Sequence, residues 1–260
     1  MSESIIAPNK IKRALSAGET VVGTMVVETR QASVMQILAN AGFDFVIVDN
    51  EHGAFSNETI GILSQMGRAI GLTPFVRVPD TTYAYIAQTL DSGAQGVMLP
   101  RITNADQVRE AVQIMKYPPM GMRGCAFARG HTGFKGGSLV DDMPRANEET
   151  TLIVQIETKP ALDSLDEILS VPGVDIALVG PTDLSIALGI PGQLEHPDLV
   201  KALETVIERC QAHGVYPALH INNGQLGRLW IEKGMAMLSS GSEIGHMMSG
   251  AQQLVSTLRD

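Results

Sequence analysis

Residues 42–52 read GFDFVIVDNEH, and this stretch contains the pattern that decides the fold. Gly42 is suited to the left-handed position just past the end of a helix. The apolar run Phe45–Val48 follows it, and then come the polar residues Asp49 to His52. A short run rich in β-branched residues and bounded by Gly or Asp is typical of a buried parallel strand. We therefore expect a helix end, a buried strand and a polar strand end, in that order.

The same order recurs along the chain, with a longer amphipathic segment after each apolar run. The expected strands are Val21–Val27, Phe45–Val48, Pro74–Val78, Gly96–Leu99, Leu152–Ile156, Asp175–Val179, Tyr216–His220 and Ala236–Ser239. The expected helices are Ala32–Ala41, Glu58–Ile70, Tyr83–Asp91, Ala105–Met115, Ala161–Leu169, Pro197–His213, Gln225–Glu232 and Glu243–Leu258. Eight strand–helix repeats in 260 residues predict a (β/α)₈ barrel that forms one domain over residues 1–260.

The ends of these helices carry residues that commonly start or stop helices. Asn57 and Asn104 are candidate N-caps, because a side-chain oxygen there accepts a hydrogen bond from an unpaired amide of the first turn. Gly71, Gly214 and Gly234 follow expected helix ends, where a left-handed residue is needed.

A doubly wound sheet has the same alternation and is the alternative architecture. Its dinucleotide-binding signature, GxGxxG, is missing after the first expected strand, where Gly23 stands alone. Residues 117–147 form a long connection without clear periodicity. A connection of that length in a compact domain is usually functional.

Composition excludes several classes of function. The chain is 44% hydrophobic and has a net charge of −9, with 19 Lys and Arg against 28 Asp and Glu. Without a cluster of basic residues, an acidic chain is a poor candidate for nucleic acid or an anionic membrane surface. Neither a signal peptide nor a membrane-spanning run is expected. Cys125 and Cys210 are expected to be reduced, buried structural thiols in a cytoplasmic protein.

Two carboxylates follow neighbouring strands of the predicted barrel. Glu157 comes after the fifth expected strand and Asp183 after the sixth. Two carboxylates, with water and substrate oxygens in the remaining positions, suit a hard divalent cation such as Mg²⁺ or Mn²⁺. Two other interpretations stay open, since strand-end carboxylates also cap helices or pair with Arg, and one of the two could transfer protons.

Other polar side chains lie on or after neighbouring strands. His52 follows Asp49 by three residues, and a carboxylate beside an imidazole fixes its tautomer and raises its basicity. Arg77 lies inside an apolar run, so it needs an anionic partner, which could be Asp49, Glu51 or a substrate carboxylate or enolate. His220 could be a site residue or a hydrogen-bonded histidine at the edge of the core. The remaining histidines are expected to be structural: His131, His196, His213 and His246.

Lysine is scarce at the expected strand ends, which bears on the type of chemistry. A Schiff-base enzyme needs a Lys there. Lys159 is the nearest of the seven lysines, and it is expected to face solvent at the start of a helix. The sequence therefore favours metal chemistry over imine chemistry.

Six motifs, in order along nearly the whole chain, resemble those of the HpcH/HpaI family, which contains the metal-dependent (class II) pyruvate aldolases. They are Val48-Asp49-Asn50-Glu51-His52, Phe75-Val76-Arg77-Val78, Gly93-Ala94-Gln95-Gly96-Val97-Met98-Leu99-Pro100, Pro118-Pro119-Met120-Gly121-Met122-Arg123-Gly124, Gln155-Ile156-Glu157-Thr158 and Val179-Gly180-Pro181-Thr182-Asp183-Leu184-Ser185. The resemblance implies a (β/α)₈ barrel of the phosphoenolpyruvate/pyruvate type. It also implies a homohexamer in which the last helix is exchanged between subunits.

The resemblance also implies roles for single residues. Glu157 and Asp183 match the ligands of a divalent metal, which would be Mg²⁺ or Mn²⁺, with Co²⁺ or Zn²⁺ as alternatives. His52 matches the catalytic histidine with Asp49 as its partner, and Arg77 matches the arginine that faces the pyruvate enolate.

The remaining matches concern the substrate. Gln155 matches a glutamine near pyruvate, and the backbone amides around Gly180, Thr182 and Asp183 would hold the pyruvate carboxylate. Asp91 matches an acidic residue that reaches the site of a neighbouring subunit. The implied reaction is the reversible cleavage of a 4-hydroxy-2-oxo acid to an aldehyde and pyruvate, or a close 2-oxo acid such as hydroxypyruvate.

Two alternatives remain beside the aldolase. A related carbon–carbon lyase or condensing enzyme on the same barrel would act on a CoA thioester or a sugar acid, with basic residues such as Arg101, Arg123, Arg129 and Lys135 for phosphates. A barrel that only binds a ligand is the second alternative. The chain departs from the family after the eighth strand, at Gly241-Ser242-Glu243, where members tend to carry an Asp after a Gly. We expect that loop, together with residues 125–137, to influence the choice of aldehyde.

Overall fold

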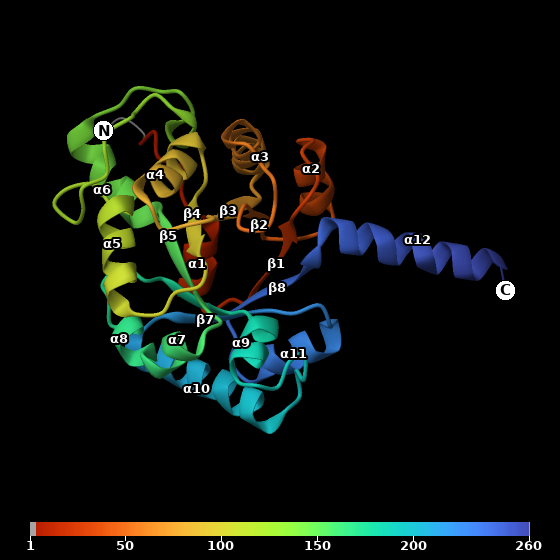
Figure 1. The fold of residues 1–260 in the computed structure, drawn as a ribbon. Helices are drawn as coiled ribbons and strands as arrows, with labels where there is room; N and C mark the ends of the chain where they lie inside the picture. Colours follow the sequence, from red (N-terminus) through yellow and green to blue (C-terminus); the bar gives the residue numbers. More distant parts are fainter. Residues whose placement is uncertain (1–3, 260) are drawn as a thin grey trace.

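The computed structural model describes residues 4–259 and shows a closed barrel of eight parallel strands, in the order in which they occur in the chain (Figure 1). The strands are β1 (Val21–Val26), β2 (Phe45–Asp49), β3 (Thr73–Arg77), β4 (Gly96–Leu99), β5 (Thr151–Ile156), β6 (Ile176–Val179), β7 (Tyr216–His220) and β8 (Met237–Ser242). Strand β8 pairs with β1 and so closes the barrel. The predicted (β/α)₈ barrel is confirmed, and the doubly wound sheet is excluded.

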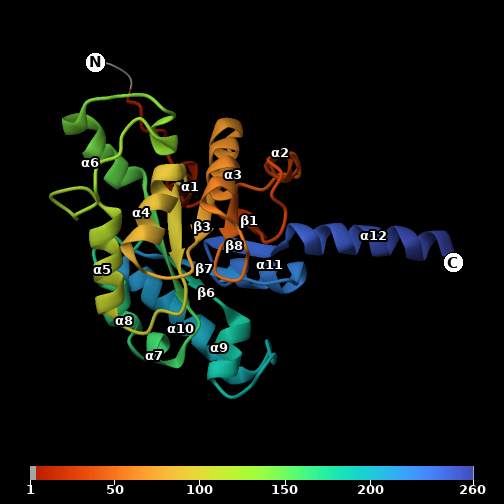
Figure 2. The same ribbon diagram turned by 45° about the horizontal axis from the view of Figure 1, so that its top comes forward.

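Most of the helices cover the outside of the barrel (Figures 1 and 2). The helices are α1 (Lys10–Ser16), α2 (Ser33–Asn40), α3 (Asn57–Ile70), α4 (Tyr83–Ser92), α5 (Ala105–Met115), α6 (Leu139–Glu149), α7 (Lys159–Asp163), α8 (Leu165–Leu169), α9 (Pro181–Ala187), α10 (Pro197–His213), α11 (Gly224–Glu232) and α12 (Glu243–Arg259). Asn104 caps α5 as expected, whereas the N-cap of α3 is Ser56 rather than Asn57. Gly71 and Gly214 adopt the expected left-handed conformation, with φ of 81° and 68°.

Alternate residues of each strand point to opposite sides, which divides the core in two. One cluster fills the barrel interior and includes Phe45, Ile47, Phe75 and Met98. Residues of opposite parity, such as Val46, pack between the strands and the helices. The barrel is therefore filled with side chains below its mouth.

Three helices were not predicted from the sequence. Helix α1 precedes β1, and α9 follows β6 directly. Helix α6 begins within residues 117–147, which were expected to be an irregular connection, and runs on to Glu149. Ser138 caps α6 by accepting a hydrogen bond from the Asp141 amide, but Pro144 and the high proportion of polar residues obscure its periodicity. The helix expected over Ala161–Leu169 is two short helices, α7 and α8, which meet at Ser164.

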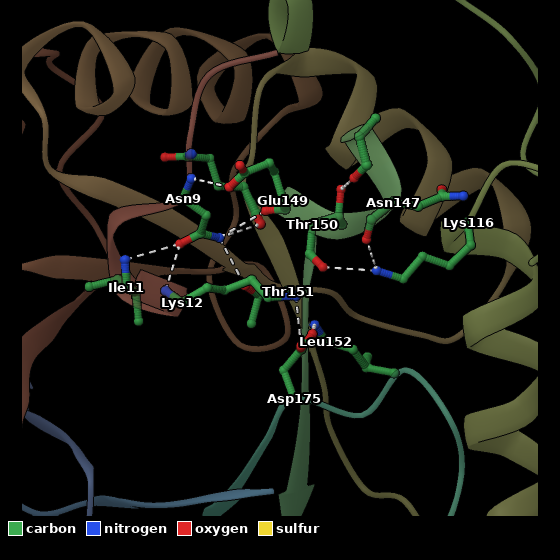
Figure 3. A network of polar contacts seen from close by, with 12 residues as sticks. Asn9, Ile11, Lys12, Lys116, Asn147, Glu149, Thr150, Thr151, Leu152 and Asp175 are labelled. Carbon is green, nitrogen blue, oxygen red and sulfur yellow. Dashed lines mark hydrogen bonds and ion pairs between the residues drawn. The ribbon is translucent and has the colours of Figure 1, made fainter. Parts of the chain in front are cut away.

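A network of buried polar groups closes the end of the barrel where the strands begin, and we call it the floor network (Figure 3). The Asn9 side chain accepts from the amides of Ile11 and Lys12 and donates to the carbonyl of Glu149 and the hydroxyl of Thr151. Lys116 Nζ donates to the carbonyls of Asn147 (2.6 Å) and Thr150 (2.9 Å). These bonds tie the chain before β1 and the end of α6 to the start of β5.

Helix α12 leaves the barrel and projects away from it (Figures 1 and 2). Its exposed apolar side chains are Ile244, Met247, Met248, Leu254, Val255 and Leu258. None of the helices within residues 4–259 is long and apolar enough to cross a membrane.

Candidate active site

The innermost side chains change from apolar to polar at the mouth of the barrel, where the strands end. The interior core contains Ile47, Phe75, Ile153, Ala218 and Met237. Two residues further along the same strands, on the same side, stand Asp49, Arg77, Gln155, His220 and Ser239. A polar layer at this end of a (β/α)₈ barrel is where catalytic groups are found.

Six of the residues predicted for the site line one cavity of about 160 Å³ in this layer. They are His52, Arg77, Gln155, Gly180, Thr182 and Asp183. Met25, Ile47, Met98 and Leu178 supply its apolar surface. The strand-end placement that follows from the sequence therefore does bring these residues together.

Arg77 is held by two carboxylates. Its Nε and Nη2 atoms donate to the two oxygens of Asp49 at 2.8 and 2.7 Å, and its Nη1 lies 2.9 Å from Glu51 Oε2. Burial alone would lower the pKa of Arg77, but the hydrogen bonds and charge of Asp49, with the charges of Glu51 and Glu157, raise it. The guanidinium is therefore permanently charged and fixed at the cavity wall.

His52 stands apart from the carboxylate that was expected to orient it. Asp49 Oδ1 accepts the backbone N–H of His52 at 3.4 Å, and the rest of the Asp49 carboxylate is occupied by Arg77. The His52 ring is 73% exposed, and its Nε2 lies 3.9 Å from Glu51 Oε2. The expected contact between Asp49 and the imidazole is thus replaced by an Asp49–Arg77 pair, because a bidentate guanidinium competes better for the buried carboxylate.

Glu157 is the buried carboxylate of the site. Its Oε1 accepts the backbone N–H of Arg101 at 2.8 Å, and its Oε2 accepts Gln155 Nε2 at 2.5 Å. Burial, together with the charges of Glu51 and Asp183, raises the pKa of Glu157 to about 7 despite the Arg101 hydrogen bond. A Cβ at position 180 would lie 2.9 Å from Glu157 Oε2, so Gly180 leaves space beside this oxygen, although Glu157 itself is not among the residues that line the cavity.

The sequence did not indicate the part that Arg101 plays. Its backbone has a φ of 53°, in the left-handed region that side chains other than glycine rarely adopt. This conformation directs the N–H of Arg101 at Glu157. Strained backbone is concentrated at functional sites.

The donor groups fit a divalent cation, although the two carboxylates alone cannot complete its coordination. Within residues 4–259, no group of three or more His, Cys, Asp or Glu side chains is arranged to hold a metal ion. Glu157 is buried near the negative charges of Glu51 and Asp183, and Gln155 Oε1 is buried with no hydrogen-bond partner. A cation bound by Glu157 and Asp183 would offset that charge, and water or substrate oxygens would supply its other ligands.

His220, which the sequence left as either a site residue or a core-edge residue, lies at the cavity. It lines the cavity, and its Nδ1 lies 2.9 Å from the Oγ of the buried Ser239. Burial and the charge of Arg77 lower the pKa of His220 to about 4, so the ring is neutral at pH 7.

Asp91 lies away from this cavity. It stands in the last turn of α4, and because α4 runs back from the mouth, its end lies beside the start of β4. Its carboxylate accepts from Arg123 Nη2 at 2.6 Å. Residues 125–137 also lie between α5 and the start of β5, so neither they nor Asp91 reach the mouth of their own barrel.

Other expectations can be compared with the structure. Arg123 is buried against Asp91, and Arg101 stands at the mouth, so the basic residues considered for a CoA substrate do not form one patch there. Lys159 is exposed at the start of α7, as predicted, and it pairs with Asp163. Cys210 is buried, but Cys125 is exposed, so the expectation of a buried thiol is wrong for Cys125.

These features define a (β/α)₈-barrel protein with an acidic, arginine-containing site at its mouth. Residues 24–249 match the model of the family described as HpcH/HpaI aldolase/citrate lyase, and the chain belongs to that family. The resemblance drawn from the sequence motifs is confirmed.

Named relatives narrow the class of activity. The chain is 36% identical, over 92% of both proteins, to a 2-dehydro-3,6-dideoxy-6-sulfogluconate aldolase from Pseudomonas putida. It is 33% identical to a 4-hydroxy-2-oxo-heptane-1,7-dioate aldolase from Escherichia coli, over 95% of this chain and 93% of that protein. The crystal structure of an HpcH/HpaI aldolase from Desulfitobacterium hafniense superposes with a TM-score of 0.93, at 34% identity and 98% coverage of both chains. The protein is a carbon–carbon lyase.

Proposed function

We propose that the protein is a metal-dependent aldolase that reversibly cleaves a 4-hydroxy-2-oxo acid to an aldehyde and pyruvate or a close 2-oxo acid. The observation that carries the proposal is the single cavity that contains His52, Arg77, Gln155, Thr182 and Asp183. The names of the relatives support the same chemistry, because one of them is an aldolase for a 4-hydroxy-2-oxo acid.

Glu157 and Asp183 would hold the divalent cation, Mg²⁺ or Mn²⁺ in the first place and Co²⁺ or Zn²⁺ as alternatives. When bound, the cation supplies a Lewis acid that stabilises negative charge on the oxygens of the 2-oxo acid. The raised pKa of Glu157 and the unpaired Oε1 of Gln155 support this placement.

The protein groups around the cavity would bind the 2-oxo acid. The N–H groups of Thr182 and Asp183 lie in the first turn of α9, where helical amides have no partner within the helix, and they suit a carboxylate. The Gly180 N–H donates to the Ile156 carbonyl, so Gly180 contributes space rather than a hydrogen bond. Gln155 and Arg77 face the keto oxygen, and Arg77 stabilises the charge that develops on it.

The cleavage step needs two proton transfers. The C4 hydroxyl loses its proton, the C3–C4 bond breaks, and its electron pair passes to C3 to give the enolate of the 2-oxo acid and the aldehyde. The enolate then takes a proton at C3. His52 is the general base and acid for these transfers, directly or through a water molecule, and its exposed ring can exchange the proton with solvent.

The assembly is also part of the proposal. The apolar face of α12 projects from the barrel, which suits exchange of this helix between subunits of a homohexamer. Asp91 lies away from the mouth of its own barrel, and we expect it to reach the site of a neighbouring subunit. The two free cysteines fit a reducing cytoplasm.

Pyruvate release from 4-hydroxy-2-oxo acids, measured with and without EDTA, tests the proposal. We expect release that EDTA abolishes and that added Mg²⁺ or Mn²⁺ restores. Borohydride added with pyruvate should leave no adduct on Lys159, because the mechanism forms no imine. Release that survives complete metal removal, or a pyruvate adduct found on Lys159 by mass spectrometry, would refute it.

A second experiment assigns the proton transfer. His52→Ala should lower the rate about 10²- to 10⁴-fold and remove the imidazole limb of the pH–rate profile. Its metal Kd should stay close to that of the wild type, because His52 is not one of the proposed ligands. If the variant instead loses the metal and keeps its rate per bound metal, His52 is a ligand.

A further inference from the structure

A second cavity, of about 430 Å³, opens from the site towards α12, and we call it the α12 groove. It shares Met25, Arg77 and His220 with the first cavity, so the two cavities lie side by side. Its other walls come from the ends of β2 and β8, the loops after β1 and β7, and the first turns of α12. A substrate held at Asp183 and Arg77 can therefore extend into the groove.

The walls of the groove carry uncharged hydrogen-bonding groups. Asn222 supplies an amide, Ser240, Ser242 and Ser249 supply hydroxyls, and His246 supplies an imidazole. Such groups both donate and accept hydrogen bonds, which is what the hydroxyl groups of a substrate require.

The charges at the groove disfavour an anion. Among the residues that the structure describes, Arg77 is the only Lys or Arg that lines it. Asp49 and Glu51 already bind all three nitrogens of that guanidinium, and Asp49 itself lines the groove. The neutral His220 adds no positive charge. A second carboxylate or a sulfonate on the substrate would thus find in the groove, as far as residues 4–259 form it, no Lys or Arg that is not already paired with a carboxylate.

Hydrogen bonds hold the first turns of α12, which form one wall of the groove, against β1 and the loop after it. Glu243, which is 7% exposed, accepts the amides of Val27, Glu28 and Thr29 at 2.8 to 2.9 Å and so fastens α12 to the loop after β1. His246 Nε2 lies 3.0 Å from Thr24 Oγ1, and the ring stacks on Phe43. The start of α12 and the His246 ring are therefore held in place before any ligand arrives, which favours specificity.

We propose that the α12 groove is the subsite for the aldehyde half of the substrate and that it selects uncharged, hydroxyl-bearing aldehydes over aldehydes with a second acidic group. This inference rests on the proposed aldolase function and adds the class of aldehyde. It sets the chain apart from the two relatives whose names specify a dioate and a sulfonated sugar acid.

A pair of matched substrates tests the selection. Two six-carbon 3-deoxy-4,5-dihydroxy-2-oxo acids of the same configuration at C4 and C5 differ only at C6, which is CH₂OH in one and a carboxylate in the other. We expect kcat/KM for pyruvate release to be at least about tenfold higher for the CH₂OH substrate, because the C6 carboxylate would lie near Asp49 without a free cation among the described residues to pair with. Equal values, or a preference for the dicarboxylate, would overturn the inference.

Two variants make the test specific to the groove. Ser249→Lys places a cation in it and should shift the ratio towards the dicarboxylate by about tenfold or more. Ala251→Lys places the same charge on α12 at a residue that does not line the groove, and it should keep the wild-type ratio. An equal shift in both variants would mean that a positive charge anywhere on α12 changes the substrate ratio. The groove would then not be the subsite for the aldehyde.

Exchange of the pyruvate methyl protons with solvent, measured without aldehyde, separates the two hypotheses. Wild-type exchange with an unaltered substrate ratio in Ser249→Lys would refute the subsite alone. Absence of metal-dependent exchange in the wild-type protein would refute the aldolase function itself.

Discussion

The two ends of the barrel each bury a set of polar side chains, and the two sets are satisfied in different ways. In the floor network, Asn9 makes hydrogen bonds with both its oxygen and its nitrogen, and Asn147 binds the amide and the carbonyl of Tyr117. At the mouth, Gln155 Oε1 has no partner and the pKa of Glu157 is raised to about 7. Buried polar groups that the chain satisfies stabilise the fold, whereas those that it leaves unsatisfied are available to a ligand.

The largest effect should come from removing the carboxylates of the mouth. Glu157→Gln and Asp183→Asn should each lower metal-dependent pyruvate release at least about 10³-fold, since each removes a charge proposed to hold the cation. The midpoint of thermal unfolding should stay equal or rise, because Glu157 is buried beside other carboxylates. Rates, metal Kd and unfolding curves measured on both variants check this. A variant that keeps near-normal rate and metal affinity would show that its residue is not a ligand.

The next largest effect should come from replacing the planar guanidinium of Arg77 with an ammonium group. Arg77→Lys should lower both pyruvate proton exchange and cleavage about 10²-fold, because an ammonium cannot bind Asp49 and Glu51 as the guanidinium does. Arg228→Lys, at an exposed ion pair on α11, is the matched control and should leave both rates unchanged. Loss of cleavage with full retention of exchange would contradict a role for Arg77 at the enolate.

In the floor network, the expected effect is on stability and not on rate. Asn9→Ala should lower the free energy of unfolding by about 3 kcal/mol, because it removes the cap of α1 and leaves buried groups unpaired. Asn104→Ala, which removes only a cap at the surface, should cost about 1 kcal/mol. Urea unfolding gives both values. A lowered kcat in folded Asn9→Ala would contradict the claim that the floor network affects stability alone.

The smallest effect is a pH dependence near the floor. Burial and the charge of Arg123 lower the pKa of His131 to about 4, below its usual 6.5. Between these values the unfolded chain binds a proton that the folded chain does not, so His131 lowers stability as the pH falls below 6.5. On going from pH 7.5 to pH 5, His131→Asn should lose about 2 kcal/mol less than the wild type. Identical losses in both proteins would show that His131 is not buried in its neutral form.

The sequence was sufficient for the barrel because eight buried strands leave a strong and repeated signal. It was also sufficient to place Arg77, Gln155, Thr182 and Asp183 together, since parallel strands end at one face. It could not show that Asp49 binds Arg77 instead of the His52 ring, because two partners competed and only three-dimensional geometry decides between them.

Other features of the molecule leave little trace in the sequence. Helix α6 is polar and contains Pro144, so its pattern is hidden, and the short helix α9 follows β6 without a connecting loop. The α12 groove is made from five separate segments of the chain, so no local sequence pattern predicts it.

The bond from Arg101 to Glu157 has a consequence for how this site can evolve. The donor is a main-chain amide, so every residue except proline could supply it, and the side chain at position 101 can vary while Glu157 keeps its orientation. Selection at that position acts on the left-handed backbone, which glycine and asparagine adopt most readily. Substitutions at position 101 can therefore introduce new side chains next to the proposed metal ligand Glu157 without changing its orientation. Such substitutions could change the substrate while the proposed metal site is retained.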